Sequence, residues 1–175
     1  LHAHADDLAL TEPQRRLLDS RYREAIRAGA GLDDAGQEEM RTISSRLADL
    51  TTTFSQMVLD DTNDSAVLVS DEADVQGMSR GAIASARRAA ADAGHDSGYL
   101  VSLELPTSQS VVSELHDAAT RRRVFDASVG RCSRGNEFDT RETVLEIVRL
   151  RARRAELLGY RDHAEYVIAE QTAPD

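Results

Sequence analysis

Residues 37–63, QEEMRTISSRLADLTTTFSQMVLDDTN, decide the fold class of this 175-residue chain. Apolar side chains recur here at intervals of 3, 4, 3, 4 and 3 residues, at Met40, Ile43, Leu47, Leu50, Phe54 and Met57. This spacing places them on one face of an α-helix. Asp33 or Asp34 can cap its start, and the acidic cluster at 60–64 is expected to end it. The pattern predicts an amphipathic helix of about 25 residues, roughly 38 Å long.

Shorter helical patterns lie on both sides of this stretch. Thr11, Pro13 and Gln14 form an N-terminal capping signature, and the helix that they open is expected to end before Gly29. Further helices are expected over residues 79–93, with Ser79 as the cap, and over 111–118, 120–129 with Thr120 as the cap, 139–158 and 163–169. Residues 71–77 and 130–138 are expected to form loops.

The helical pattern is interrupted by a small β element at about residues 65–105. Residues 66–69 and 99–105 have the composition and alternation of short strands, and Pro106 is expected to close the second. Two strands alone are marginally stable, so a third strand or covering helices are expected. The predicted fold is mainly α with a small β element, and residues 1–175 are expected to form one partial domain.

Composition excludes several classes of protein but does not identify a function. The hydrophobic fraction is 41%, which is enough for a core, and the aromatic fraction is only 4%, without Trp. No run approaches the ~18 apolar residues that a membrane span needs. The single cysteine, Cys132, excludes a disulfide framework and a Cys-rich zinc site.

The charge distribution is uneven along the chain. All 21 basic residues are Arg, against 31 acidic residues, which gives a net charge of −10. Residues 1–79 hold 16 acids and 7 Arg, a net charge of −9, whereas residues 80–175 are close to neutral. A generally basic nucleic-acid binder is therefore not favoured, and a nucleic-acid module is the weakest of the hypotheses for the function. An acidic helical module that binds a basic protein partner remains an alternative hypothesis for the function.

Candidate metal ligands are few and poorly spaced. His2 and His4, followed by Asp6 and Asp7, would share a face only in an extended segment, and a frayed terminus is the favoured interpretation. The motif H-E-x-x-H does not occur, and His95, His116 and His163 are expected at the surface or at helix caps.

The acidic cluster Asp60, Asp61, Asn63 and Asp64 resembles part of a calcium loop. The pattern fails, because a loop opening at Asp60 has Ser65 instead of Gly at its sixth position and Asp71 instead of Glu at its twelfth. These residues are expected simply to end the long helix.

Two further groups invite a chemical interpretation. Cys132 lies between Arg131 and Arg134, whose charges are expected to lower the pKa of its thiol. No His or Asn partner can be identified for it, so nucleophilic catalysis is not favoured. The Arg residues at 121, 122, 123, 131 and 134 could contact phosphates, but ion pairs with neighbouring acids are expected in a chain of this charge.

Three segments resemble one enzyme family. Residues 37–63, residues 99–106 (YLVSLELP) and residues 133–167 (SRGNEFDTRETVLEIVRLRARRAELLGYRDHAEYV) resemble the amino-terminal half of the oligopeptidase A / peptidyl-dipeptidase (thimet oligopeptidase-like) family of zinc metallopeptidases. The most specific part is Leu-Leu-Gly-Tyr at 157–160 followed by His-Ala-Glu-Tyr at 163–166. Leu-Asp-Asp-Thr-Asn at 59–63 is more similar to the bacterial peptidyl-dipeptidase branch. The resemblance covers about residues 12–170.

The resemblance implies a helical lobe of a larger, two-lobed, clam-like cytoplasmic peptidase that hydrolyses short unfolded peptides. In this family zinc is held by the histidines of H-E-x-x-H and a downstream Glu, and the motif's own Glu activates water. None of these residues has a counterpart here, so no catalytic or metal-binding residue is assigned, and this chain is expected to bind no zinc by itself. The substrate-binding residues remain unknown. The implied partners are peptides and a missing carboxy-terminal catalytic lobe, without nucleic acid or membrane.

The start at Leu1 instead of Met suggests an excised piece, which we expect to be inactive alone and to expose apolar faces that would pack on the missing portion. An H-E-x-x-H motif downstream of residue 175 in the reading frame would distinguish this hypothesis from the acidic interaction module.

Overall fold

The structure is a computed structural model that describes residue 2, residues 7–104 and residues 107–171. The chain divides into two compact units. We call them the terminal unit, formed by the described residues of 1–51 and 145–175, and the central unit, formed by those of 52–144. The prediction of one partial domain over residues 1–175 stays a prediction.

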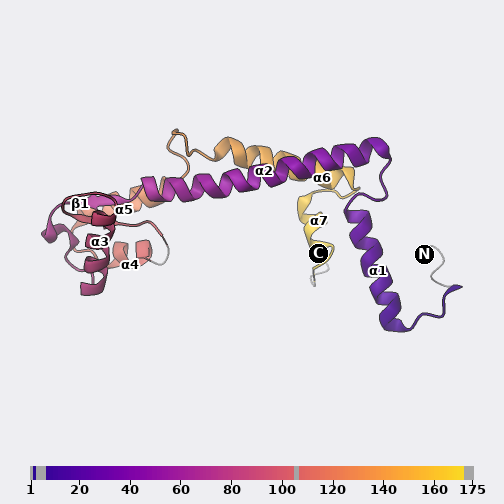
Figure 1. The fold of residues 1–175 in the computed structure, drawn as a ribbon, viewed down its shortest axis with the longest axis horizontal. Helices are drawn as coiled ribbons and strands as arrows, with labels where there is room; N and C mark the ends of the chain where they lie inside the picture. Colours follow the sequence, from indigo (N-terminus) through magenta and orange to yellow (C-terminus); the bar gives the residue numbers. More distant parts are fainter. Residues whose placement is uncertain (1, 3–6, 105–106, 172–175) are drawn as a thin grey trace. The chain divides into compact units, whose positions relative to one another are not determined.

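The predicted fold class is confirmed, because helices dominate the described residues and one small sheet accompanies them (Figure 1). In chain order the elements are α1 Glu12–Arg27, α2 Asp34–Asp64, β1 Val67–Val69, the 3₁₀ helix η2 Glu72–Val75, α3 Arg80–Asp92, β2 Tyr99–Val101, α4 Thr107–Glu114, α5 Ala118–Val129, α6 Arg141–Leu157 and α7 His163–Ile168.

Helix α2 is the predicted long helix, and it is longer than expected at 31 residues. The acidic cluster at 60–64 forms its last turn instead of following it. The predicted apolar face is buried at Met40, Ile43, Leu47 and Leu50 and half-buried at Phe54 and Met57. Tertiary burial of this face, and not the charge of its last residues, therefore determines how far the helix continues.

Local side-chain contacts explain where several helices begin. The Thr11 backbone N–H donates to Gln14 Oε1 at 2.9 Å, and Ser79 Oγ accepts from the Ala82 N–H, so both predicted caps are confirmed. Helix α5 is capped by Asp117 and not by Thr120 as predicted. Asp117 accepts from the Thr120 N–H at 2.6 Å, because a carboxylate three residues earlier reaches the free amide.

Helix α4 occupies Thr107–Glu114, about one turn before the predicted 111–118. The reason is a tertiary contact, since the His116 N–H donates to the Gln76 carbonyl at 2.8 Å and draws the chain out of the helix. Gly77 lies where these two segments approach each other. It has φ +100°, and a Cβ built on it would lie 2.0 Å from the Glu114 carbonyl oxygen. Only glycine fits this position without movement of the backbone.

The sheet is a single antiparallel pair with the register Val67↔Val101, Leu68↔Leu100 and Val69↔Tyr99. Strand β2 is shorter than the predicted 99–105, and Pro106 lies outside the described residues. Within the described part of the chain no third strand joins the pair; α3 packs on β2 and α5 packs on β1. Covering helices, the second predicted alternative, therefore support the sheet.

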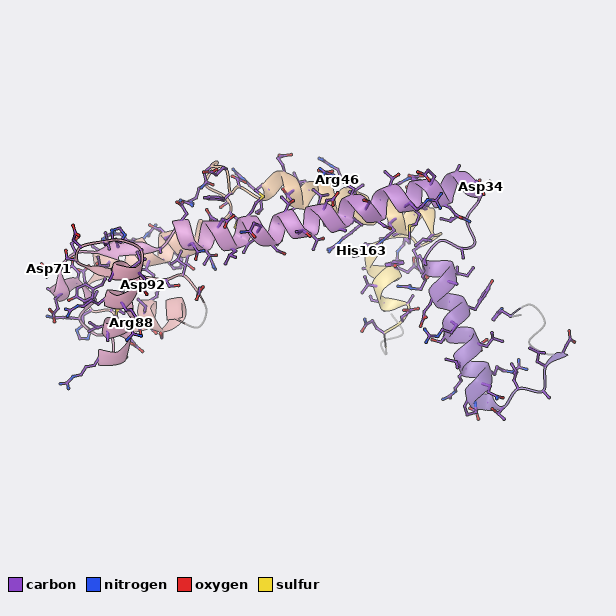
Figure 2. All side chains as sticks on the ribbon, viewed as in Figure 1. Asp34, Arg46, Asp71, Arg88, Asp92 and His163 are labelled. Atoms are coloured by element: carbon purple, nitrogen blue, oxygen red, sulfur yellow. The ribbon has the colours of Figure 1, made fainter. Side chains whose placement is uncertain are left out.

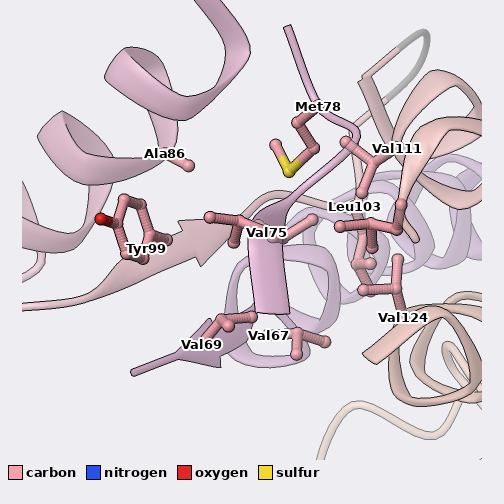
Figure 3. Close-up of a cluster of buried hydrophobic side chains, with 11 residues drawn as sticks. Val67, Val69, Val75, Met78, Ala86, Tyr99, Leu103, Val111 and Val124 are labelled. Carbon is pink, nitrogen blue, oxygen red and sulfur yellow. The ribbon is translucent and has the colours of Figure 1, made fainter. Parts of the chain in front are cut away.

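One hydrophobic core organises the central unit. Figure 3 shows side chains from the strands and the surrounding helices converging on Val75, which is fully buried. The cluster consists of Val67, Val69, Val75, Met78, Ala86, Tyr99, Val101, Leu103, Val111, Leu115 and Val124. Each strand contributes its first and third residues, as the alternation of a half-buried strand requires.

In the terminal unit, two arginine–glutamate pairs join α2 to α6. Arg46 donates to both carboxylate oxygens of Glu146 at 2.6 and 2.8 Å, and Arg153 donates to both oxygens of Glu39 at 2.6 and 2.9 Å. Such two-point pairs fix the register of two helices more strictly than single contacts.

Candidate functional site

The most elaborate polar cluster in the described residues surrounds Asp61, in the last turn of α2. Its carboxylate is fully buried and accepts hydrogen bonds from the Arg134 guanidinium and from the Cys132 N–H, the latter at 2.6 Å. Arg134 also contacts Asp64 at 2.7 Å. Burial alone would raise the pKa of Asp61, but the hydrogen bonds from Arg134 and Cys132 outweigh it and hold the pKa below its ordinary value.

The Asp61 cluster attaches the loop between α5 and α6 to the end of α2. Cys132 adopts φ +57°, the left-handed region that non-glycine residues rarely enter, and its carbonyl accepts from the Thr140 N–H at 3.0 Å. The role of the cluster is therefore structural, because it holds this loop against the end of α2. The cluster is not the calcium loop that the sequence partly resembles, because the Asp61 oxygens point at Arg134 and the Asp60 carboxylate accepts from Gln56.

The expected activation of Cys132 is wrong. Burial raises the pKa of its thiol, and the neighbouring Asp61 carboxylate raises it further, whereas Arg131 lowers it only partly. Arg134 was expected to lower this pKa as well, but its charge is compensated by the Asp61 carboxylate with which it pairs. Cys132 therefore behaves as a half-buried structural thiol.

The Arg residues of the 121–134 segment form two kinds of contact. Arg122 pairs with Asp126 at 2.7 Å and Arg134 pairs with Asp61 and Asp64, as predicted. The other three donate to backbone carbonyls: Arg121 to Leu115 and His116, Arg123 to Leu68, and Arg131 to Ser128 and Leu103. For these three the predicted partner is wrong, because their guanidinium groups donate to these carbonyl oxygens and no carboxylate of the described residues lies within ion-pair distance.

The histidines do not form a metal centre in the described part of the chain. His2 Nε2 lies 3.3 Å from Asp19 and its ring stacks on Tyr22, while His4 and Asp6 lie outside the described residues. No group of three or more His, Cys, Asp or Glu side chains there is arranged to hold a metal ion.

Two of the three remaining histidines match the prediction, since His95 and His116 are exposed. His163 is the exception. It is half-buried at the start of α7 (Figure 2), and Nδ1 has no hydrogen-bond partner in the described structure. Burial lowers its pKa, and the charges of Arg151 and Arg154 lower it further.

The acidic half of the chain is extensively paired. Glu24 pairs with Arg21, Glu38 with Arg41, and Glu39 with Arg153, in addition to the Asp61 and Asp64 contacts with Arg134. Arg21 and Arg41 are already counted in the net charge of −9, and Arg27 and Arg46 pair with Glu170 and Glu146 outside this half. The alternative hypothesis of an acidic interaction module therefore stays a prediction.

Several large apolar side chains are exposed. They are Leu8, Leu17, Tyr22, Ile26, Leu59, Phe125, Val129, Val144, Leu145, Val148 and Val167. On α5, Phe125 and Val129 are four residues apart and are 48% and 63% exposed. The helices of the described residues include none that is long and apolar enough to cross a membrane.

Comparison with known proteins supports the resemblance stated above. Residues 111–175 match the model of Peptidase family M3. The chain is 33% identical over 168 residues to the dipeptidyl carboxypeptidase of Escherichia coli K12, an alignment that covers 96% of this chain and 25% of that protein. It is 31% identical to the probable cytosolic oligopeptidase A of Arabidopsis thaliana and 32% identical to the oligopeptidase A of E. coli K12. Each of these two alignments covers 94% of this chain, and they cover 24% and 25% of the relatives, respectively.

The similarity therefore extends over nearly the whole chain, while the chain spans about a quarter of the length of the curated relatives it matches. The sequence segments that carried the resemblance lie in α2, in β2 with the residues that follow it, and in the region from the loop before α6 to α7.

Proposed function

We propose that this chain, which is related to the peptidases of family M3, is a helical portion of a longer zinc-dependent oligopeptidase that hydrolyses short peptides. The observation that carries the proposal is the identity of 29–33% to dipeptidyl carboxypeptidases and oligopeptidases A over more than nine-tenths of this chain. Similarity that extends over more than nine-tenths of the chain indicates a shared fold and not a shared short motif.

The chemistry is proposed to reside outside these residues. The sequence contains no H-E-x-x-H, which is the arrangement that places two histidines on one helical face for zinc and a glutamate beside the bound water. The most elaborate polar cluster here, around Asp61, is saturated by Arg134 and Cys132 and serves the fold. The role proposed for this chain is therefore to shape the access of peptides to a zinc site that a carboxy-terminal catalytic lobe carries.

A cytoplasmic location is part of the proposal. It is supported by the relative named probable cytosolic oligopeptidase A, although a relative named organellar oligopeptidase A matches the chain to a similar degree, at 30% identity.

The test is a peptide-hydrolysis assay on the 175-residue chain with added Zn²⁺, using an internally quenched fluorescent peptide. We expect no turnover above a protein-free control. Turnover that a chelator abolishes would overturn the assignment of the chemistry to another lobe. A second test is to read the gene beyond the codon for residue 175, where we expect an in-frame H-E-x-x-H motif. Absence of this motif over the next several hundred codons would contradict the proposal.

A further inference from the structure

Helix α3 presents an unusual basic face in the central unit. Arg80, Arg87 and Arg88 are all exposed, in a protein whose net charge is −10. Seven residues separate Arg80 from Arg87, which is about two helical turns and ~10.5 Å along the axis. A separation of seven residues therefore places both arginines on one side of α3. Arg88, labelled in Figure 2, is the next residue along the helix after Arg87.

Two of these guanidinium groups have no partner among the described residues. No carboxylate there lies within ion-pair distance of Arg80 or Arg88, whereas most other arginines of the chain are paired. Arg87 is held in place, since it donates to Tyr99 Oη at 2.8 Å and its guanidinium lies 5.3 Å from the centre of the Tyr99 ring. The face thus combines one fixed and two uncommitted positive groups.

A shallow, open hollow of about 490 Å³ lies along this face, and the larger part of its lining surface is apolar. Ile83, Ala84 and Ala91 line it together with the three arginines, and among the residues that the structure describes Glu72, from η2, is the only carboxylate in the lining. Glu72 is 3.9 Å from Arg87, which is the long limit of an ion pair. Three positive groups against one negative group leave the hollow positively charged.

We propose that this hollow binds an acidic segment of another polypeptide, in which two apolar residues lie between two residues that carry carboxylates. Two carboxylates three residues apart on a polyproline II chain, which repeats every three residues, lie on one side of that chain and about 9 Å apart, which is close to the separation of Arg80 and Arg87 along α3. The intervening apolar side chains would cover Ile83 and Ala84 and remove their surface from water. This site goes beyond the proposed peptidase function and does not depend on it.

A nucleic acid fits the same features less well. Affinity for a phosphate backbone grows with the number of arginine or lysine contacts, and three groups on an acidic protein are few. The hollow also offers alanine side chains where stacking on a base would need an aromatic ring. An acidic peptide uses both the charge and the apolar part of the lining.

The test is fluorescence anisotropy with the 175-residue chain and a fluorescein-labelled peptide, Gly-Ser-Glu-Leu-Leu-Glu-Ser-Gly. The control peptide replaces both Glu by Gln. We compare the double variant Arg80→Ala/Arg88→Ala with Arg149→Ala/Arg151→Ala, which removes two exposed arginines from α6. A third variant, Ala84→Glu, keeps all three arginines and places a carboxylate in the hollow. Circular dichroism checks that each variant folds.

We expect the Glu peptide to bind at 50 mM salt and to bind less tightly as the salt concentration rises. The Arg80→Ala/Arg88→Ala change should weaken it at least about fivefold, as expected for two exposed charge contacts. Ala84→Glu should weaken it similarly, and the α6 variant less than about twofold. Equal loss in both double variants, equal affinity for the Gln peptide, no binding of either peptide, or tighter binding of a single-stranded DNA oligonucleotide would overturn the proposal.

Discussion

Removal of the Arg134 side chain tests the structural role of the Asp61 cluster most directly. Arg134→Ala leaves the fully buried Asp61 carboxylate with the Cys132 N–H as a remaining donor. Loss of one partner of a buried ion pair costs about 3–5 kcal/mol of the free energy of unfolding. Because Arg134 is itself 35% exposed, water can partly replace it, and we place the loss at about 2 kcal/mol.

The substitution Asp61→Asn removes the charge of this side chain and keeps its shape. The amide oxygen can still accept from the Cys132 N–H, and no buried charge remains unpaired, so the loss should be smaller, at about 1 kcal/mol. In the double variant Arg134→Ala/Asp61→Asn the two losses should not add, since the residues share one contact. Arg122→Ala is the matched control. It breaks an exposed ion pair with Asp126 within α5 and should leave the free energy of unfolding unchanged within error.

The assay is urea denaturation followed by circular dichroism at pH 7, together with amide hydrogen exchange at Cys132. The exchange measurement is needed because two compact units can unfold in separate steps. Arg134→Ala should lower the midpoint and accelerate exchange of the Cys132 amide. A variant that unfolds within 0.5 kcal/mol of the parent and keeps its Cys132 protection would refute the reasoning.

Three further predictions concern other sites. Gly77→Ala should cost about 2–3 kcal/mol in thermal unfolding, since its Cβ would meet the Glu114 carbonyl, while Gly94→Ala, with positive φ but open space around it, should cost about 1 kcal/mol; equal costs would contradict the steric argument. Because the pKa of His163 is lowered in the folded state, the terminal unit should be most stable above the unfolded-state value of about 6.5 and lose stability as the pH falls below it. His163→Gln should flatten that dependence between pH 5 and 7 in urea titrations, and an unchanged profile would show that His163 is not responsible. Phe125→Ser with Val129→Ser should reduce the binding of a hydrophobic dye and self-association in light scattering; the exposed pair Arg149→Ser with Arg151→Ser is the control, and equal effects would exclude an apolar origin.

The sequence predicted the elements whose signals are local. The period of Met40, Ile43, Leu47 and Leu50 identified α2, and the Thr11 and Ser79 caps identified the starts of α1 and α3. It did not predict features that depend on contacts between distant residues. The end of α4 follows from a bond to Gln76, and β2 is shorter than its alternation suggested.

The Asp61 cluster shows the same limit for the candidate sites. Asp61 and Arg134 were both noticed, one in an acidic run and the other in a basic run, but nothing local indicates that they meet. That pairing reverses the expected effect on the Cys132 thiol. Nothing local in the sequence indicates that Arg80 and Arg88 have no carboxylate partner among the described residues, because this depends on which carboxylates lie near them in space.

The long-range contacts within the two units are nested along the chain, and this order has a kinetic consequence. The partners are 73 residues apart for Asp61 and Arg134, 100 for Arg46 and Glu146, 114 for Glu39 and Arg153, and 133 for Arg27 and Tyr160. Each inner contact shortens the loop that the next outer contact must close, so its entropic cost falls. Folding is thus expected to proceed from the middle of the polypeptide toward both ends, with the contacts of Arg27 to Tyr160 and Glu170 forming last and breaking first.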